Sequence, residues 1–307
     1  MIRTERLTKR YDTLTAVDGV GFEARPGEVL GFLGPNGAGK TTTMRMIAGF
    51  IAPSEGSASI CGHDVERAPL AARAALGYLP EGAPSYGEMS VRGFLEFVAS
   101  LRGLAGERRR ERLGHVLERL ALGPVAAQTI DTLSKGFRRR VGIAQAILHD
   151  PPVLILDEPT DGLDPNQKHE VRELIGEMAA DKTIVVSTHI LEEVDAVCTR
   201  AIIIANGRIV ADDTPQGLAA RSRYHNAVTL RLEHAAQFGA ARAALEALPQ
   251  VGSVEAAERE LSVTAVPVTG ARIFDAVNAL AAREGYALKG IELESGRLDE
   301  VFRTITA

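Results

Sequence analysis

The sequence predicts an α/β fold with a largely parallel sheet, followed by a second, smaller α+β domain. The first observation is that apolar runs of strand length alternate with helical patterns through the first two thirds of the chain, which is typical of a sheet covered by helices. The second is a glycine-rich loop between one such run and a helix. We expect strands near residues 28–33, 57–61, 76–79, 153–156, 183–187 and 201–205, and helices near 39–49, 164–180 and 190–198.

The segment from about 82 to 150 interrupts this alternation and is predicted to be a helical subdomain inserted into the α/β core. Val91–Leu101 has apolar side chains three and four residues apart, and the next helix repeats this spacing from Leu113 to Leu120. Such spacing is expected for helices with one buried face. The run Arg108-Arg109-Arg110 opens that second helix and is either a solvated face or a docking surface for a partner.

The pattern changes again after about residue 218, where the predicted order is β-α-β-β-α-β, the ferredoxin-like order. We expect strands over 226–233 and 286–293, a hairpin over 251–266, helices over 235–248 and 271–284, and a final short helix over 298–305. The chain is therefore divided into a first domain of residues 1–218 and a C-terminal α+β domain of residues 219–307. The second domain carries no catalytic or metal-binding motif, and its order of elements alone predicts no activity.

Composition excludes several classes of protein. With 45% hydrophobic and 24% charged residues, the chain is typical of a globular protein. A net charge of −5 and a pI near 5.9 argue against a dedicated nucleic-acid binder. Cys61 and Cys198 are too few for a disulfide framework. No apolar run approaches the ~18 residues of a membrane span, and the N-terminal residues lack the apolar region of a secretory signal.

The segment Gly34-Pro-Asn-Gly-Ala-Gly-Lys40-Thr41 matches the phosphate-binding pattern G-x-x-x-x-G-K-[ST] (the P-loop) at every fixed position. Its glycines allow several backbone N–H groups to point at one phosphate chain, and the start of the following helix adds a positive field. Lys40 would reach the β- and γ-phosphates, and Thr41 would offer its hydroxyl to Mg²⁺. The alternative is a chance glycine-rich turn, but the match lies between a strand and a helix, which favours nucleoside triphosphate binding.

A second candidate follows the apolar strand 153–156, which ends in Asp157 and Glu158. In an open α/β sheet, groups at the carboxyl ends of strands face the ligand crevice. Asp157 would hold Mg²⁺, usually through water, and Glu158 could polarise a water molecule for attack on the γ-phosphate. The alternative interpretation is an exposed acidic pair at the end of a strand, which is less favoured beside an intact phosphate loop.

Two further segments carry weaker signals by themselves. Leu133-Ser-Lys-Gly-Phe137 opens a helix, and a Ser and a Gly at a helix N-terminus can bind an anion, although Ser134 could simply cap the helix. His189 follows the strand near 183–187, again at a carboxyl end. A lone histidine there is more often structural than catalytic.

Together these segments resemble the nucleotide-binding subunit of ATP-binding-cassette (ABC) transporters over roughly residues 1–215. The resemblance implies that Tyr11 stacks on adenine, and that the phosphates are bound by Gly34, Pro35, Asn36, Gly37, Ala38, Gly39, Lys40, Thr41 and Thr42. It implies a magnesium residue in Asp157, a catalytic carboxylate in Glu158 and a switch histidine in His189. The loop with Asp164 would face the dimer partner, and the signature residues Leu133, Ser134, Lys135, Gly136 and Phe137 would close on ATP held by the other subunit.

The sequence departs from the family pattern in three places. The signature reads Leu-Ser-Lys-Gly-Phe instead of Leu-Ser-Gly-Gly-Gln, and Asp161-Gly162 stands where a Ser-Ala pair is commoner. Glu81 occupies the position of a glutamine. Its extra negative charge would attract Mg²⁺ and repel the γ-phosphate, so Glu81 joins Thr41 and Asp157 as a metal-site candidate. Glu81, the Ser-Lys-Gly-Phe signature and the segment Asp164-Pro165-Asn166-Gln167 together resemble the ATPases that pair with separate ABC-2-type permeases, including some linked to gliding motility, and this resemblance implies export.

The resemblance implies ATP and Mg²⁺ as cofactors, a homodimer that sandwiches two ATP molecules, and a separate multi-span membrane permease as partner. It places the chain in the cytoplasm, peripheral to the cell membrane, with no nucleic-acid partner. A cassette protein acting on ribosomes or DNA would need a second cassette or a long coiled-coil insertion, and this sequence has neither. A phosphotransferase would leave the signature and His189 unexplained. The C-terminal domain is expected to serve dimerisation or regulation, or else to be a structural extension.

Overall fold

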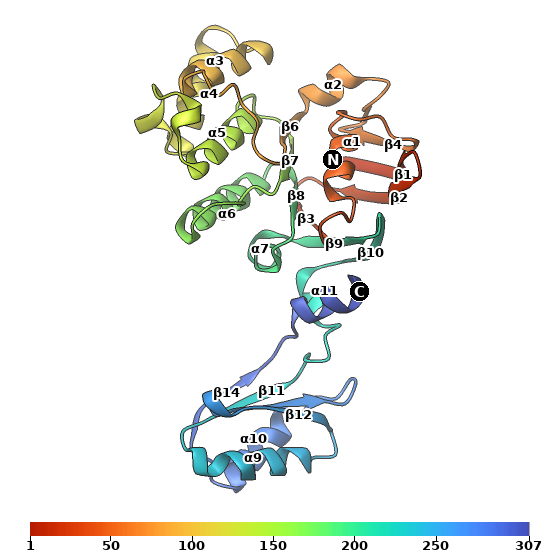
Figure 1. Cartoon of the computed structure of the whole chain (residues 1–307), viewed down its shortest axis with the longest axis vertical. Coiled ribbons are helices and arrows are strands. Elements are labelled where there is room, and N and C mark those ends of the chain that lie inside the picture. Colours follow the sequence, from red (N-terminus) through yellow and green to blue (C-terminus); the bar gives the residue numbers. More distant parts are fainter. Residues whose placement is uncertain (307) are drawn as a thin grey trace. The chain divides into compact units, whose positions relative to one another are not determined.

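The computed structural model describes residues 1–306 and divides them into two compact units, residues 1–212 and residues 213–305 (Figure 1). The boundary predicted after residue 218 falls inside the short helix α8 (Pro215–Ala219), which belongs to the second unit. Thr214 caps this helix by accepting a hydrogen bond from the Gly217 amide, and Pro215 occupies its first turn. The boundary between the two units therefore comes before this cap.

The first unit is built on a six-stranded sheet with the strand order β10-β9-β3-β8-β7-β6. Four pairs of neighbours in it, β3 with β8, β3 with β9, β6 with β7 and β7 with β8, are parallel. Its strands are β3 (Val29–Leu33), β6 (Leu76–Leu79), β7 (Val153–Asp157), β8 (Thr183–Thr188), β9 (Arg200–Ala205) and β10 (Arg208–Asp213). Because the strands from β3 to β6 run in the same direction, the loops that follow them leave from one edge of the sheet.

Both faces of this sheet are covered, as Figure 1 shows, by helical segments on one side and by α1 with a second sheet on the other. Alternate residues of each strand enter the two cores, as the period of a strand requires. Leu154 and Leu156 pack with the helices on one face, while Val153 and Ile155 pack with α1 on the other. The helices are α1 (Lys40–Ile47), α2 (Pro69–Ala74), α3 (Val91–Leu101), α4 (Gly106–Arg119), α5 (Lys135–Ile147), α6 (Pro165–Ala179) and α7 (Leu191–Val197).

The second sheet is antiparallel and corrects one expectation from the sequence. The run near 57–61 was expected in the parallel layer, but β4 (Glu55–Ile60) pairs with β1 (Ile2–Tyr11) in a four-stranded sheet of order β2-β1-β4-β5, which also contains β2 (Leu14–Ala24) and β5 (His63–Asp64). This run is too polar for a strand buried on both faces, and only Ala58 and Ile60 of β4 are buried.

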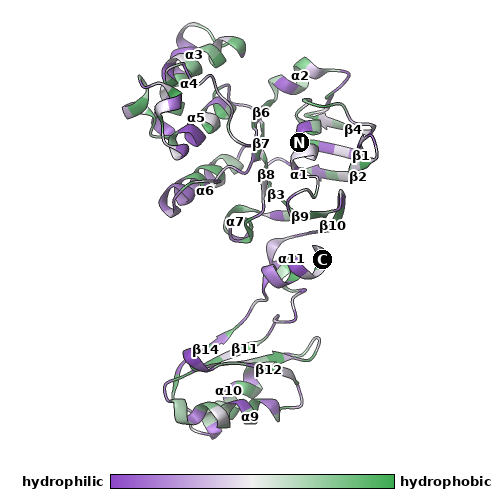
Figure 2. Ribbon diagram, in the orientation of Figure 1, coloured by the Kyte–Doolittle hydropathy of each residue, from purple (hydrophilic) through white to green (hydrophobic). Residues whose placement is uncertain are grey.

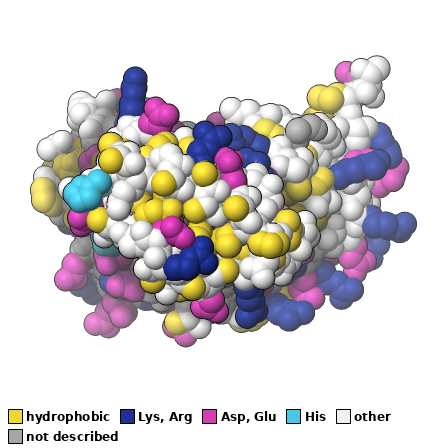
Figure 3. Space-filling view, turned by 90° about the horizontal axis from the view of Figure 1, so that it is seen from below, with side chains coloured by type: hydrophobic (Ala, Val, Ile, Leu, Met, Phe, Trp, Pro, Cys, Tyr) yellow, Lys and Arg dark blue, Asp and Glu magenta, His cyan; other side chains and the backbone are white. Residues whose placement is uncertain are grey.

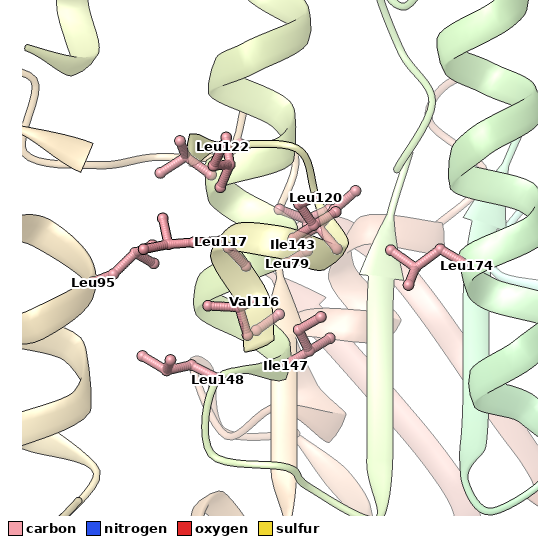
Figure 4. Close-up of a cluster of buried hydrophobic side chains, with 14 of the residues drawn as sticks. Leu79, Leu95, Val116, Leu117, Leu120, Leu122, Ile143, Ile147, Leu148 and Leu174 are labelled. Atoms are coloured by element: carbon pink, nitrogen blue, oxygen red, sulfur yellow. The ribbon is translucent and has the colours of Figure 1, made fainter. Parts of the chain in front are cut away.

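The helical subdomain consists of α3, α4 and α5, within the predicted range 82–150. Its leucines and valines meet those of the sheet and α6 in one cluster, part of which is drawn in Figure 4. Leu95, Val116, Leu122 and Leu148 are each fully buried there. Hydrophilic residues predominate along α6 (Figure 2), where Val171, Leu174 and Ile175 are the buried residues.

The second unit has the predicted element order β-α-β-β-α-β. Its elements are α8, β11 (Val228–Leu232), α9 (Phe238–Glu246), β12 (Val251–Ala257), β13 (Ser262–Pro267), α10 (Phe274–Arg283), β14 (Leu288–Leu293) and α11 (Leu298–Thr306). The four strands form an antiparallel sheet of order β12-β13-β11-β14, and its core contains Val228 and Leu230 of the sheet with Leu245 and Val277 of the helices. Figure 3, seen from the side of α9 and α10, shows hydrophobic side chains with charged groups around them.

Within residues 1–306, no helix is both long enough and apolar enough to cross a membrane.

Candidate active site

A cavity of 440 Å³ lies where the parallel strands end and α1 begins. Its lining residues are Tyr11, Leu14, Ala16, Asn36, Gly37, Gly39, Lys40, Thr41, Thr42, Glu81 and Glu158. The structure therefore brings together nine of the residues selected from the sequence, although they come from four separate segments. The selected residues that do not line the cavity are Gly34, Pro35, Ala38, Asp157, Asp164, His189 and the signature residues Leu133, Ser134, Lys135, Gly136 and Phe137.

Leu14 and Ala16 also line the cavity, and the sequence analysis missed them. They follow the two-residue turn that joins β1 to β2, and Leu14 pairs with Tyr11 across that turn. Tyr11 is 44% exposed and Leu14 63% exposed, so both offer an accessible apolar surface. The apolar residues of the segment Leu14–Ala24 were the available signal, but Asp18 and two glycines interrupt its apolar run.

The phosphate loop is held in a conformation that its glycines make possible. A Cβ atom at Gly34 would lie 2.4 Å from the Ile204 carbonyl oxygen, and one at Gly39 would lie 2.6 Å from the Ala16 oxygen. Gly39 also has a φ of 104° at the N-cap of α1, a backbone region that side chains rarely tolerate. The Gly207 amide, in the turn between β9 and β10, donates a 3.0 Å hydrogen bond to the Ala38 oxygen and supports the loop from outside.

Lys40 is the first residue of α1, at the end of the phosphate loop, and is 6% exposed. Its ammonium group donates to the Gly34 oxygen at 2.7 Å and to the Pro35 oxygen at 3.2 Å. Burial lowers the pKa of Lys40, and the carboxylates of Glu158, Asp157 and Glu81 oppose this shift. A positive charge is thus held at the floor of the cavity by backbone oxygens that a phosphate could replace.

Asp157 is fully buried at the end of β7. One carboxylate oxygen accepts a hydrogen bond from the Ser187 hydroxyl, and the other is buried without a hydrogen bond of normal geometry. Burial raises the pKa of this carboxyl group and the Glu81 charge adds to the shift, while the Ser187 and Thr41 hydroxyls and the Lys40 charge oppose it. A buried oxygen of this kind costs free energy unless something binds it, and a carboxylate oxygen is a ligand that Mg²⁺ prefers.

The donor set fits a magnesium ion that is shared with a bound phosphate group. Among residues 1–306, no three or more His, Cys, Asp and Glu side chains are grouped so that they could hold a metal ion by themselves. Mg²⁺ usually keeps several water ligands and binds through one or two carboxylates together with substrate phosphates. Asp157, Thr41 and the exposed Glu81 are the candidate donors here.

Glu158 and His189 form a pair at the same edge. Nδ1 of His189 lies 2.9 Å from Oε1 and 2.8 Å from Oε2 of Glu158. The Glu158 side chain is 15% exposed and lines the cavity, whereas the His189 side chain is 51% exposed. Parallel pairing of β7 with β8 explains the contact, because each residue directly follows one of these neighbouring strands. Glu158 also has a positive φ of 53°, which is uncommon for a residue with a side chain.

The signature segment lies at the start of α5, away from the lining of this cavity. Ser134 is the N-cap and accepts a hydrogen bond of 3.3 Å from the Phe137 amide. Lys135 forms an ion pair of 2.9 Å with Asp161. Asp164 has a similar local role, since it caps α6 by accepting a 3.0 Å bond from the Gln167 amide. Ser134 and Asp164 therefore each cap a helix of their own chain. This structural role is compatible with the additional contact across a dimer that the sequence predicts for both residues.

Comparison with known proteins identifies relatives of this chain. The family model described as "ABC transporter" matches residues 17–161. The Nod factor export ATP-binding protein I of Paraburkholderia xenovorans is 39% identical over 220 residues, which cover 71% of this chain and 72% of that protein. A probable multidrug ABC transporter ATP-binding protein of Escherichia coli is 35% identical over 223 residues, which cover 72% of this chain but 38% of that protein.

Solved structures give the same result. The ATP-binding subunit of an ABC transporter superposes with a TM-score of 0.68 at 32% identity, covering 72% of this chain and 92% of that one. A dimeric bacterial ABC transporter cassette superposes with a TM-score of 0.66 at 25% identity, covering 70% of this chain and 99% of that one.

Proposed function

The chain belongs to the ABC transporter family as an ATP-binding subunit, and from this premise we propose that it hydrolyses ATP at Glu158 to drive a separate membrane permease. The observation that carries the proposal is the cavity that both Lys40 and Glu158 line, with His189 bonded to Glu158. A cation for phosphate, a base and a positioned histidine are the groups that hydrolysis of a phosphoanhydride requires.

ATP would bind with its base on Tyr11 and its phosphates on the loop that starts α1. The exposed Tyr11 ring and Leu14 offer an apolar surface to the base. The amides from Asn36 to Thr42 and the N-terminus of α1 favour negative charge, and Lys40 would exchange its two backbone acceptors for phosphate oxygens.

Mg²⁺ would be held by the Thr41 hydroxyl and by Asp157, with Glu81 beside them, and when bound it would neutralise phosphate charge. The Asp157 oxygen that lacks a hydrogen bond of normal geometry supports this assignment. Ser187 holds the other oxygen and so fixes the orientation of the carboxylate. Glu81 adds a negative charge where a glutamine would add none.

Glu158 would accept the proton of the attacking water, and His189 would contact the γ-phosphate. Glu158 is mostly buried, which keeps competing solvent away from its carboxylate. His189 is the more exposed member of the pair and is free to reach a phosphate at the mouth of the cavity. Their contact of 2.8–2.9 Å allows His189 to hold Glu158 in one orientation.

A homodimer completes the site in this proposal. The signature residues do not line the cavity of their own chain, and the N-terminus of α5, with Ser134 and Gly136, suits a phosphate that a second copy presents. Asp164 would lie in the loop that contacts the partner. Closed two-fold pairing is the commonest symmetry for such assemblies.

The permease would dock on a groove between the core and the helical subdomain. The groove has a volume of 380 Å³ and is lined by Ala48, Gly49, Phe50, Arg73, Leu76, Tyr78 and Arg102. Phe50 is 68% exposed, and its ring contacts the edge of the Tyr78 ring with 5.3 Å between the ring centroids. An apolar segment of the permease would cover the exposed Phe50 ring, and it would hold the chain on the cytoplasmic face of the membrane.

Export is the direction that we propose, because one relative is named for Nod factor export and another for multidrug transport. Pairing with an ABC-2-type permease is the finer form of the same proposal. For the C-terminal unit we propose a role in dimerisation or regulation of the ATPase, with the structural extension as the second candidate.

One experiment tests both the chemistry and the transport role. The tagged chain carrying Glu158→Gln is purified from its native membrane with Mg-ATP, beside the wild type and the control Glu173→Gln, which alters an exposed carboxylate on α6. We expect hydrolysis to fall by about 10²- to 10⁴-fold with ATP binding retained, and a multi-span permease to co-purify. Hydrolysis at more than a tenth of the wild-type rate would contradict the role of Glu158, and recovery of ribosomes or a DNA-repair assembly would contradict the transport role.

A further inference from the structure

A third carboxylate lies behind the Glu158–His189 pair. Glu193 is on α7 and is 3% exposed. Both of its oxygens are bonded to threonine hydroxyls and not to a cation: Thr160 donates to Oε1, and Thr188 donates to Oε2 at 2.7 Å. A buried carboxylate is costly unless its oxygens are bonded, so this three-residue network holds its members in place.

The direction of the hydrogen bond between Thr188 and Glu193 follows from the second partner of the Thr188 hydroxyl. The Thr188 hydroxyl accepts a 3.1 Å bond from the Ile190 amide, which leaves its single proton for Glu193. Thr160 and Thr188 are 3% and 1% exposed, so water does not compete for either bond. Hydrogen bonds to a charged group in a buried place are stronger than neutral ones.

The network connects the two segments that carry the catalytic pair. Thr160 comes two residues after Glu158, and Thr188 directly precedes His189. Strands β7 and β8 hold the beginnings of these segments through their pairing, and the Glu158 amide donates 3.0 Å to the Ser187 oxygen. The pairing of β7 with β8 ends there. Beyond it, the two segments are connected by the Glu193 carboxylate, which accepts hydrogen bonds from Thr160 and Thr188.

We propose that Glu193 is a positioning residue for hydrolysis, which sets the relative placement of Glu158 and His189 by binding Thr160 and Thr188 at once. This inference rests on the proposed catalytic roles of Glu158 and His189. Its physical basis is that a catalytic group displaced by about 1 Å can lose about 10²-fold in rate. Thr188 pairs in the sheet with Leu33, just before the phosphate loop, but among residues 1–306 the side-chain hydrogen bonds of the network go to Glu193 and to the Ile190 amide and not to that loop. Because ATP binding depends on the phosphate loop, we expect Glu193 to act on turnover and not on affinity.

The test removes one hydroxyl and keeps the volume. Thr160→Val deletes the donor to Glu193 but keeps the backbone bond of 3.2 Å from the Leu163 amide to the Thr160 oxygen. We expect kcat for ATP hydrolysis to fall about 10- to 100-fold, the factor that corresponds to one hydrogen bond to a charged group, with KM for ATP within about twofold. Thr160→Ser keeps the hydroxyl and should restore kcat, and Glu192→Gln, an exposed neighbour on α7, should leave it unchanged.

A double-mutant cycle separates positioning from a structural role. In a His189→Ala background, Thr160→Val should have a much smaller further effect on kcat, because the placement of Glu158 relative to His189 no longer matters once His189 is gone. Glu193→Gln is the second variant. A glutamine has one oxygen and one NH₂ group, so it would present the NH₂ group to one of the two threonine hydroxyls that donate to Glu193. It should therefore lower kcat as Thr160→Val does. The proposal is overturned if both variants turn over at the wild-type rate, or if the loss of ATP affinity matches the loss of kcat. It is also overturned if Thr160→Val lowers kcat equally with and without His189, or if both variants fail to fold.

The roles of Glu193 and Glu158 are tested separately. If Glu158→Gln abolishes hydrolysis while Thr160→Val turns over at the wild-type rate, the positioning role is wrong and the proposed function stands. If Glu158→Gln hydrolyses normally, the proposed function is wrong, whatever Thr160→Val does.

Discussion

Gly142 allows α5 to approach the segment that carries Glu81, and replacing it by alanine should destabilise the first unit. A Cβ atom at this position would lie 2.7 Å from the Cβ of Ala83 and 2.7 Å from Cδ1 of Leu79. The Leu79 side chain can rotate, but the Ala83 Cβ is attached directly to the backbone and cannot move alone. Alanine at 142 must therefore push α5 and residues 79–83 apart.

The magnitude follows from two opposing contributions. Overpacking of a dense core costs about 1–3 kcal/mol, and two contacts well inside van der Waals distance place Gly142→Ala at the upper end. Alanine in a helix interior gains about 1 kcal/mol over glycine. The net loss should be about 2 kcal/mol, which lowers the melting temperature of a unit of this size by about 4–8 °C.

The assay is thermal unfolding of the wild type, Gly142→Ala and the matched control Gly176→Ala. Gly176 also lies inside a helix, but a Cβ there would meet nothing within 4 Å. The same substitution should therefore raise the melting temperature at 176, by about 2–4 °C, and lower it at 142. If Gly142→Ala is stabilised as much as Gly176→Ala, α5 does not pack on residues 79–83 as described.

Two further predictions concern charge. Burial lowers the pKa of His149 to about 4 from its ordinary 6.5, so between those values the unfolded chain binds a proton that the folded chain does not. Stability should therefore rise as the pH is raised from 4 to 6.5, with a shallower rise in His149→Gln, as measured by urea midpoints; equal slopes in the two proteins would disprove this. Glu81→Gln removes one exposed charge beside the metal-site candidates and should raise the Mg²⁺ concentration for half-maximal hydrolysis about 5-fold, as expected for about 1 kcal/mol. An unchanged Mg²⁺ requirement would remove Glu81 from the site.

The sequence predicted the central strands and the phosphate loop because each has an uninterrupted local signal. Val153–Asp157 is buried at every position, so its apolar run is continuous and ends at the two carboxylates. β1 was missed for the opposite reason. Its pairing with β2 has register shifts between Thr4 and Leu7 and again on either side of Lys9, so its buried residues do not alternate, and the period of two on which a strand prediction depends is lost.

Contacts between distant segments were the part that the sequence could not predict. Glu193 reads as one of two acids in the first turn of a short helix, where a carboxylate is favoured by the helix dipole alone. Glu192 occupies the same kind of position and is exposed. Nothing local distinguishes the two residues, and only the approach of Thr160, from a segment 33 residues earlier in the sequence, makes Glu193 a buried acceptor.

The site lies at the boundary of two hydrophobic cores, and this arrangement has a consequence for mutations far from it. Leu156 and Val186 pack on the face of the helical subdomain, while Ile155 and Val185 pack on the face of α1. These residues alternate on the two strands that end at Glu158 and His189. Because interiors are close-packed and transmit strain, a volume change on either face would move both strand ends. Substitutions at these positions should therefore alter turnover together with stability, whereas substitutions in the core of the second unit, such as at Leu245, should alter the stability of that unit alone.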